Sequence, residues 1–166
     1  MLLKNCVTAM AVCFMYPNAP AIQDYSSAGL KNRSGNSPSL GDMSKDGFCI
    51  WNSTSDYPFG VCFGSGTTPV SPTDYNVETE ISDITVSVSR VISYSGDKPK
   101  CTITITGQYN GSSEVSISEI GFYKGMAWRY PTNPDYQFLM YREVLSEPIV
   151  LNQNDNFTIV RDWVIE

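Results

Sequence analysis

Residues 84–106 read ITVSVSRVISYSGDKPKCTITIT, and this stretch decides the fold. Apolar and polar side chains alternate on both sides of a central turn sequence, residues 95–99. A period of two is that of a half-buried β-strand, and the Gly and Pro mark a turn. The pattern therefore predicts an antiparallel hairpin whose apolar side chains face one core: Ile84, Val86, Val88, Cys101, Ile103 and Ile105.

Short apolar segments of the same kind lie on both sides of the hairpin. They are residues 48–51, 61–63, 115–122, 138–144, 149–151 and 157–165. Asn110-Gly111 and residues 152–155 are turn sequences, and Glu147-Pro148 is expected to break the strand before it. Several short strands with polar turns are typical of a sandwich or barrel. We predict a mainly β fold, with an antiparallel β-sandwich domain over residues 48–166.

The first 47 residues have a different character. Apolar residues recur there at helical spacing and form one stripe: Leu2, Leu3, Cys6, Val7, Met10, Ala11 and Phe14. Pro17 and Pro20 end this helix near Tyr16. A signal peptide cleaved near Ala21 is the alternative, but the amphipathic spacing favours a helix. The run is too short and too polar for a membrane span.

Residues 23–47 are rich in Gly, Ser and Asn, which is typical of a linker or an extended arm. Such a segment has little to bury, so it leaves the apolar stripe of the helix uncovered. We therefore predict that residues 1–47 dock on a neighbouring subunit through Leu2, Leu3, Cys6, Val7, Met10 and Phe14. A trimer or ring of copies is the expected assembly, by analogy alone.

Composition excludes several functions. The net charge is −6, so the chain lacks the basic surface that nucleic acids and anionic membranes attract. The chain has five cysteines, an odd number without C-x-x-C spacing, which favours buried thiols made in a reducing cytoplasm. Because there is no histidine, Ser-His-Asp, Cys-His and mixed Cys/His zinc sites are ruled out.

Few groups of residues suit catalysis. Gly64-Ser65-Gly66 matches two glycines of a nucleotide loop, but Thr67-Thr68-Pro69 follows instead of a helix, so a turn at a strand end is favoured. Three glutamate pairs have the carboxylates that glycan hydrolysis needs, and solvated strand-edge charge explains them equally well: Glu78 and Glu80, Glu114 and Glu119, Glu143 and Glu147. We predict no catalytic, cofactor-binding or metal residues.

Three further segments stand out by their order. The first is residues 61–69 (VCFGSGTTP) with 74–77 (DYNV), the second is 118–122 (SEIGF), and the third is 139–144 (LMYREV) with 148–151 (PIVL). In this order they resemble small virion structural proteins of tailed phages. Those proteins carry a G-x-G-T-T-P-P-like loop, a D-Y-x-L-like box, an I-x-E-I-G-L-like strand and an L-x-x-R-x-x-L…P-I-x-L-like pair. The likeness covers residues 61 to about 165, and Val70, Val77 and Phe122 depart from it.

The resemblance implies a non-enzymatic virion component of the tail, neck or capsid exterior, bound to copies of itself and to other virion proteins. The residues themselves predict that Arg142 pairs with Glu119 or Asp74 and locks the loop to the sheet, although an exposed Arg142 is the alternative. Asp74 is also expected to fix the turn after it, and Gly121 implies a bulge or a close backbone approach.

Two other functions remain open. A carbohydrate-binding module for host attachment would use the aromatic residues of a Pro-rich loop, Trp128, Tyr130 and Tyr136, to stack on sugars. The same side chains suit a subunit contact, where Trp and Tyr are enriched. A glycan hydrolase is the third function class, and it would use one of the glutamate pairs.

Overall fold

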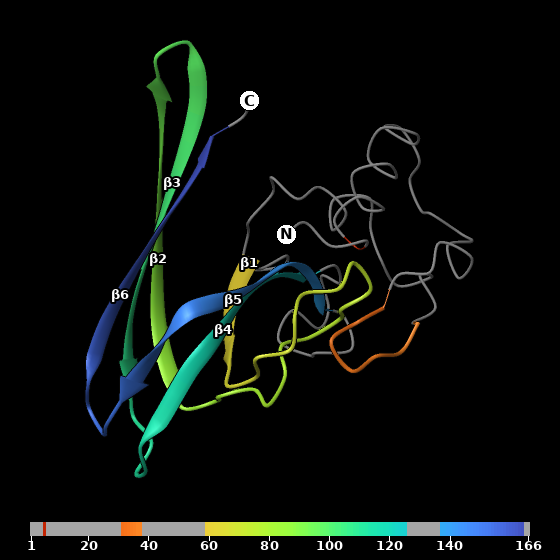
Figure 1. The fold of residues 1–166 in the computed structure, drawn as a ribbon, viewed down its shortest axis with the longest axis vertical. Coiled ribbons are helices and arrows are strands. Elements are labelled where there is room, and N and C mark those ends of the chain that lie inside the picture. The colour runs from red at the N-terminus through yellow and green to blue at the C-terminus, as the bar shows by residue number, and fades with distance from the viewer. Residues whose placement is uncertain (1–4, 6–30, 38–58, 126–136, 165–166) are drawn as a thin grey trace. The chain divides into compact units, whose positions relative to one another are not determined.

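The computed structural model describes residue 5 and residues 31–37, 59–125 and 137–164 (Figure 1). The fold is mainly β, with two three-stranded antiparallel sheets of order β1-β4-β5 and β2-β3-β6. The strands are β1 (Phe59–Gly64), β2 (Ile84–Ser95), β3 (Lys98–Tyr109), β4 (Val115–Gly125), β5 (Gln137–Leu151) and β6 (Asn156–Val164). The chain forms two compact units, one within residues 1–80 and 117–148 and the other within 81–116 and 149–166.

The predicted hairpin is the centre of the second unit. β2 pairs with β3 without interruption from Ile84↔Tyr109 to Ser95↔Lys98. Gly96 has φ +64 as the first residue of the two-residue turn, which is the place of glycine in a type II′ turn. β3 pairs in turn with β6, so β3 is the central strand of this sheet.

The six residues predicted to share a core do share one face of the sheet, as the register Val88↔Ile105 shows. Their burial differs, however, and this corrects the prediction. Ile103 and Ile105 on the central strand are buried, whereas Val86 and Val88 on β2 are exposed. The reason is that β2 lies at the edge of its sheet and has a neighbouring strand on one side only.

The expected break at Pro148 is wrong. β5 continues through this proline from Gln137 to Leu151. Proline is tolerated at a sheet edge because its missing N–H can fall on the side without a partner strand. β5 is an edge strand of its sheet, and the boundary between the two units also falls directly after Pro148.

The sheet of the first unit contains β1, β4 and β5. β1 and β4 pair from Phe59↔Lys124 to Gly64↔Glu119, and Cys62, Val77 and Leu139 form a buried apolar cluster on this unit. Gly121 makes the close approach that its place in a strand implied: a Cβ there would lie 2.7 Å from both Cys62 Sγ and Leu139 Cδ1. The register through Gly121 is regular, so the glycine is needed for space rather than for a bulge.

Part of the predicted arm contacts strand β5 within the first unit. Asn32 and Arg33 are buried, and the Arg33 amide donates to the carbonyl of Gln137 at 2.9 Å. The Asn5 amide side chain is buried too and donates to the Lys31 and Leu139 carbonyls at 2.8 and 3.2 Å. Residues 31–37 therefore have polar groups to bury on their own chain, which the Gly, Ser and Asn composition did not indicate.

Other predictions for this region lie outside the described residues. They concern the apolar stripe of the helix, the strand at 48–51 and most of the arm. In the part of the chain that is described, no helix is long and apolar enough to cross a membrane.

Candidate functional site

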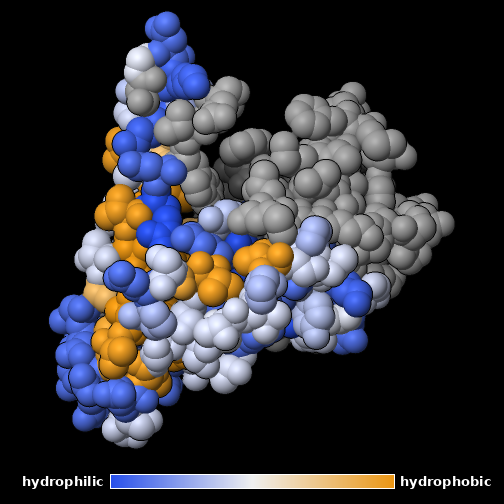
Figure 2. Space-filling model, in the orientation of Figure 1, coloured by the Kyte–Doolittle hydropathy of each residue, from blue (hydrophilic) through white to orange (hydrophobic). Residues whose placement is uncertain are grey.

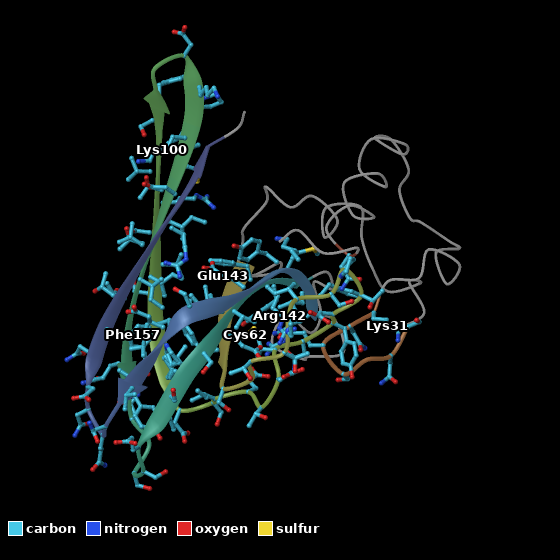
Figure 3. The ribbon with its side chains drawn as sticks, in the orientation of Figure 1. Lys31, Cys62, Lys100, Arg142, Glu143 and Phe157 are labelled. Atoms are coloured by element: carbon cyan, nitrogen blue, oxygen red, sulfur yellow. The ribbon has the colours of Figure 1, made fainter. Side chains whose placement is uncertain are left out.

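A buried arginine cluster occupies the first unit. Arg142 comes from β5, Glu119 from the neighbouring β4, and Asp74 from the loop between β1 and β2. Arg142 and Glu119 are 1% and 0% exposed, so the alternative of an exposed arginine does not hold. Figure 3 labels Arg142 among the side chains between these strands and the loop.

The contact between Arg142 and Glu119 is bidentate. Arg142 Nε donates to Glu119 Oε2 at 3.1 Å, and Nη2 donates to Oε1 at 2.8 Å. Two parallel hydrogen bonds between a guanidinium and a carboxylate are the strongest form of this pair, and they fix its orientation. The pair therefore ties β5 to β4 through side chains as well as through the backbone ladder.

The same guanidinium holds the loop. Nη1 donates to Asp74 Oδ2 at 2.6 Å, and Nη2 donates to the Thr68 carbonyl at 3.3 Å. Glu119 Oε2 also accepts a hydrogen bond of 3.0 Å from the Glu78 amide. Loop residues 68, 74 and 78 are thus attached to one ion pair on the sheet.

Asp74 also shapes the loop locally. Its Oδ2 atom accepts from the Ser71 amide at 2.9 Å, while its own amide donates to the Ser71 carbonyl at 3.1 Å. The turn that Asp74 fixes therefore precedes it, whereas the sequence placed that turn after it. An aspartate that binds a nearby backbone amide and an arginine at once couples a local turn to the tertiary fold.

The electrostatics favour a permanently charged arginine. Burial lowers the pKa of Arg142, but the hydrogen bonds that Arg142 donates to Glu119 and Asp74, together with the negative charges of these groups, outweigh this effect and hold the pKa above its ordinary value. Glu78 Oε1 lies 3.9 Å from Nη2, so three carboxylates surround one guanidinium. If the cation is removed, the fully buried Glu119 carboxylate loses its compensating charge and faces the charges of Asp74 and Glu78.

Gly66, the second glycine of the G-x-G sequence, leaves room for this cluster. A Cβ at this position would approach Glu119 Oε1 and two Glu78 atoms more closely than 3.0 Å. We expect Gly66→Ala to reduce the free energy of unfolding by roughly 1–3 kcal/mol, because the carboxylates must move away from Arg142. Urea unfolding measures this effect, and the exposed neighbour change Ser65→Ala is the control. Equal stability of the two variants would contradict the prediction.

A second arginine contact was not predicted. Arg33 donates to Gln137 Oε1 at 2.8 Å and to Asn76 Oδ1 at 3.1 Å, and it forms an ion pair with Glu80. Its guanidinium carbon also lies 4.5 Å from the centre of the Tyr123 ring, a cation–π geometry. The only sequence signal was an arginine inside an Asn/Gly turn, because its partners lie more than 40 residues away.

Glu78 and Glu80 form one of the pairs considered for glycan hydrolysis, but each lies beside a different arginine. Residues 78–80 do not form a strand: Glu80 makes only a bridge to Gly64, and Thr79 has φ 47. The shared sheet face that this pair required is therefore absent. Glu78 faces Arg142, and Glu80 binds Arg33.

Cys62 behaves as the buried thiol that the sequence predicted, whereas Cys101 is only half-buried. Burial raises the pKa of Cys62 to about 12. Because the thiolate is the reactive form, we expect Cys62 to resist alkylation at pH 8 in the folded chain, and Cys101 to react faster. Mass spectrometry of the alkylated peptides measures both rates. A Cys62 rate equal to that in urea would contradict this expectation.

The raised pKa of Cys62 also makes the stability of the fold depend on pH. The folded thiol keeps its proton above the ordinary pKa of 9.0, whereas the unfolded thiol loses it. The contribution of Cys62 is therefore fully present below pH 9 and is lost as the pH rises toward 12.

Several predicted site residues lie outside the described residues. They are the docking residues Leu2, Leu3, Cys6, Val7, Met10 and Phe14, and the aromatic residues Trp128, Tyr130 and Tyr136. Within residues 5, 31–37, 59–125 and 137–164, no three His, Cys, Asp or Glu side chains are grouped to hold a metal ion.

No protein-family model, curated protein or solved structure matches this chain. The resemblance to tailed-phage virion proteins therefore stays a prediction. The site itself defines a sheet-to-loop ionic lock.

Proposed function

We propose that the chain is a non-enzymatic virion structural protein of a tailed phage, made in the host cytoplasm and assembled into the tail, neck or capsid exterior. In this proposal the two sheets form a β-sandwich, and the N-terminal helix and arm dock on a neighbouring subunit. The partners are copies of the chain, as a trimer or ring, and other virion proteins.

The observation that carries the proposal is the convergence of the three resembling segments. Thr68 and Asp74 belong to the first segment, Glu119 to the second and Arg142 to the third, and one guanidinium contacts all three partners. Segments separated by up to 74 residues thus act as one structural unit. Because these residues form one cluster, the three segments must occur together in the chain. This explains why their order and spacing support the resemblance, although each segment alone is weak evidence.

The chemistry of the lock suits a structural role. Arg142 is buried and binds two carboxylates and a carbonyl, so the cluster fixes a loop of residues 65–80 against the sheet. A rigid loop presents the same surface in every copy, which reduces the conformational entropy lost when subunits assemble.

Purified particles of the phage that encodes the chain test this proposal. Mass spectrometry should find the chain in the particles at a fixed copy number, and antibodies against it should label one region in electron micrographs. Absence from the particles would contradict the virion role. Release of reducing sugar from host polysaccharide, abolished by changing one glutamate pair to glutamine, would contradict the non-enzymatic role.

A truncation tests the docking role of the predicted helix. A chain starting at Gly29 keeps residues 31–37, and with them the contacts of Arg33, but lacks the apolar stripe. We expect it to remain folded by circular dichroism and to lose incorporation into particles. The full chain with Asn5→Ala is the control, since it loses the buried Asn5 contacts and keeps the stripe. Normal incorporation of the truncated chain would contradict the docking role.

A further inference from the structure

Within residues 59–125 and 137–164, no strand pairs with the outer edge of β2. β2 is the end strand of its sheet, and its twelve residues pair with β3 without a bulge. Among these residues Arg90 is the only charged one, and none is proline. Proteins usually protect such edges with charges, prolines, bulges or short strands, because the free N–H and C=O groups bind other strands.

The side chains of this edge are unusually apolar for exposed positions. Residues 85–94 are all exposed, and Ile92, Tyr94 and Val91 are 75%, 74% and 61% exposed. Figure 2 shows hydrophobic side chains over the middle and lower part of this sheet, below a hydrophilic tip. An exposed edge strand of twelve residues with one mostly apolar face is a binding surface for a strand that also has an apolar face.

The turn determines which backbone groups face outward. In a two-residue hairpin the closing residues, here Ser95 and Lys98, bond to each other across the two strands. Alternate residues then direct their N–H and C=O groups away from β3. Counted back from Ser95, the outward residues are Tyr94, Ile92, Arg90, Val88, Val86 and Ile84.

We propose that β2 pairs antiparallel with β2 of a second copy, about a twofold axis at Ser89. This contact joins two sheets into one of six strands, with the order β6-β3-β2-β2-β3-β6. Each outward residue then meets an outward residue of the other copy. The pairs on the apolar face are Ile84 with Tyr94, Val86 with Ile92, and Val88 with Arg90.

The charge of Arg90 selects this register. An axis at Arg90 would place the two guanidinium groups directly opposite each other, which is unfavourable. An axis at Val88 would leave Tyr94 opposite residue 82, outside the strand. Only the axis at Ser89 uses the whole edge from Ile84 to Tyr94 and separates the charges.

β2 of a second copy is also a better partner for this edge than β6 of a second copy. β6 runs parallel to β2 within one copy, because both are antiparallel to β3, so β6 of a second copy pairs parallel to β2 when the apolar faces of the two sheets lie on the same side. Parallel pairing is slightly less stable per residue, and β6 carries Arg161 and Asp162. The twofold contact stands apart from the virion role: its failure would leave that role untouched, and it adds a dimer to the predicted trimer or ring.

A disulfide at the axis tests the register in the full chain. Paired residues at Ser89 do not exchange hydrogen bonds, so their Cα atoms lie about 4.5 Å apart, within the range of a disulfide. We expect Ser89→Cys to form a covalent dimer under mild oxidation. Ser87→Cys is the matched control, because residue 87 faces Val91 of the other copy and should remain unlinked, as should the parent chain.

Charge at Val88 gives a second test that does not depend on oxidation. Because Val88 meets Arg90 twice in the dimer, Val88→Glu should tighten the dimer and Val88→Lys should weaken it. Two such contacts change the dimer Kd by roughly 2- to 30-fold in each direction. Sedimentation at several concentrations measures both constants, and circular dichroism checks that each variant is folded.

Three results would overturn the proposal. One is a parent chain that stays monomeric at all concentrations, with Ser89→Cys unlinked. Another is equal crosslinking of Ser87→Cys and Ser89→Cys, which indicates unspecific association. The third is weakening by both Val88→Glu and Val88→Lys, which indicates an apolar contact without this register.

Discussion

Replacing Arg142 with methionine is expected to reduce the free energy of unfolding by roughly 3–5 kcal/mol. Methionine fills much of the space but leaves the fully buried Glu119 carboxylate without its cation. Asp74 and the Thr68 carbonyl lose their donor at the same time. Urea unfolding followed by circular dichroism measures the loss.

The control for Arg142→Met is Lys100→Met, which breaks the exposed pair with Asp162. Lys100 and Asp162 are 29% and 46% exposed, so solvent screens their ion pair and it adds little to stability. Hydrogen bonds from Lys100 and Thr102 lower the pKa of Asp162, so its small contribution is lost as the pH falls through the lowered folded value. A loss for Arg142→Met no larger than that of the control would disprove the lock.

The second large effect is expected at the centre of the other sheet. Ile103→Ala should reduce the free energy of unfolding by roughly 2–5 kcal/mol, since Ile103 is buried on the central strand β3 and its removal leaves a cavity. Ile92→Ala is the control, because Ile92 lies on the same face of the edge strand and is exposed. It should change stability by less than about 0.5 kcal/mol. A loss that small for Ile103→Ala would place this residue outside the core.

The expected difference in stability loss between Ile103→Ala and Ile92→Ala shows that periodicity alone does not predict burial. Alternation determines which face a side chain shares, and the register confirms that the six predicted apolar residues of β2 and β3 lie on one face. It contains no information on which strand is central. Burial depends on the neighbours on both sides, and those come from the pairing of β3 with β6, about 55 residues away.

In the candidate site too, the sequence indicated some residues and gave no indication of others. Arg142 stood out because it lies between apolar neighbours, and a charged residue that is buried there must find partners. The sequence left open which carboxylate binds Arg142, and the structure shows that both do. Arg33 gave no such signal, since it lies in a polar turn and its burial depends on Gln137, Glu80 and Tyr123.

Local chemistry alone determined the two strands of the hairpin and the Gly96 turn. These features depend on the period of the side chains and on the allowed backbone angles, which a short segment carries within itself. Tertiary structure decided the passage of β5 through Pro148, the exposed edge of β2, the close approach at Gly121 and the convergence of Thr68, Asp74 and Glu119 on Arg142. Each of these depends on which strand lies beside which, and strand order follows from contacts between residues far apart in the chain.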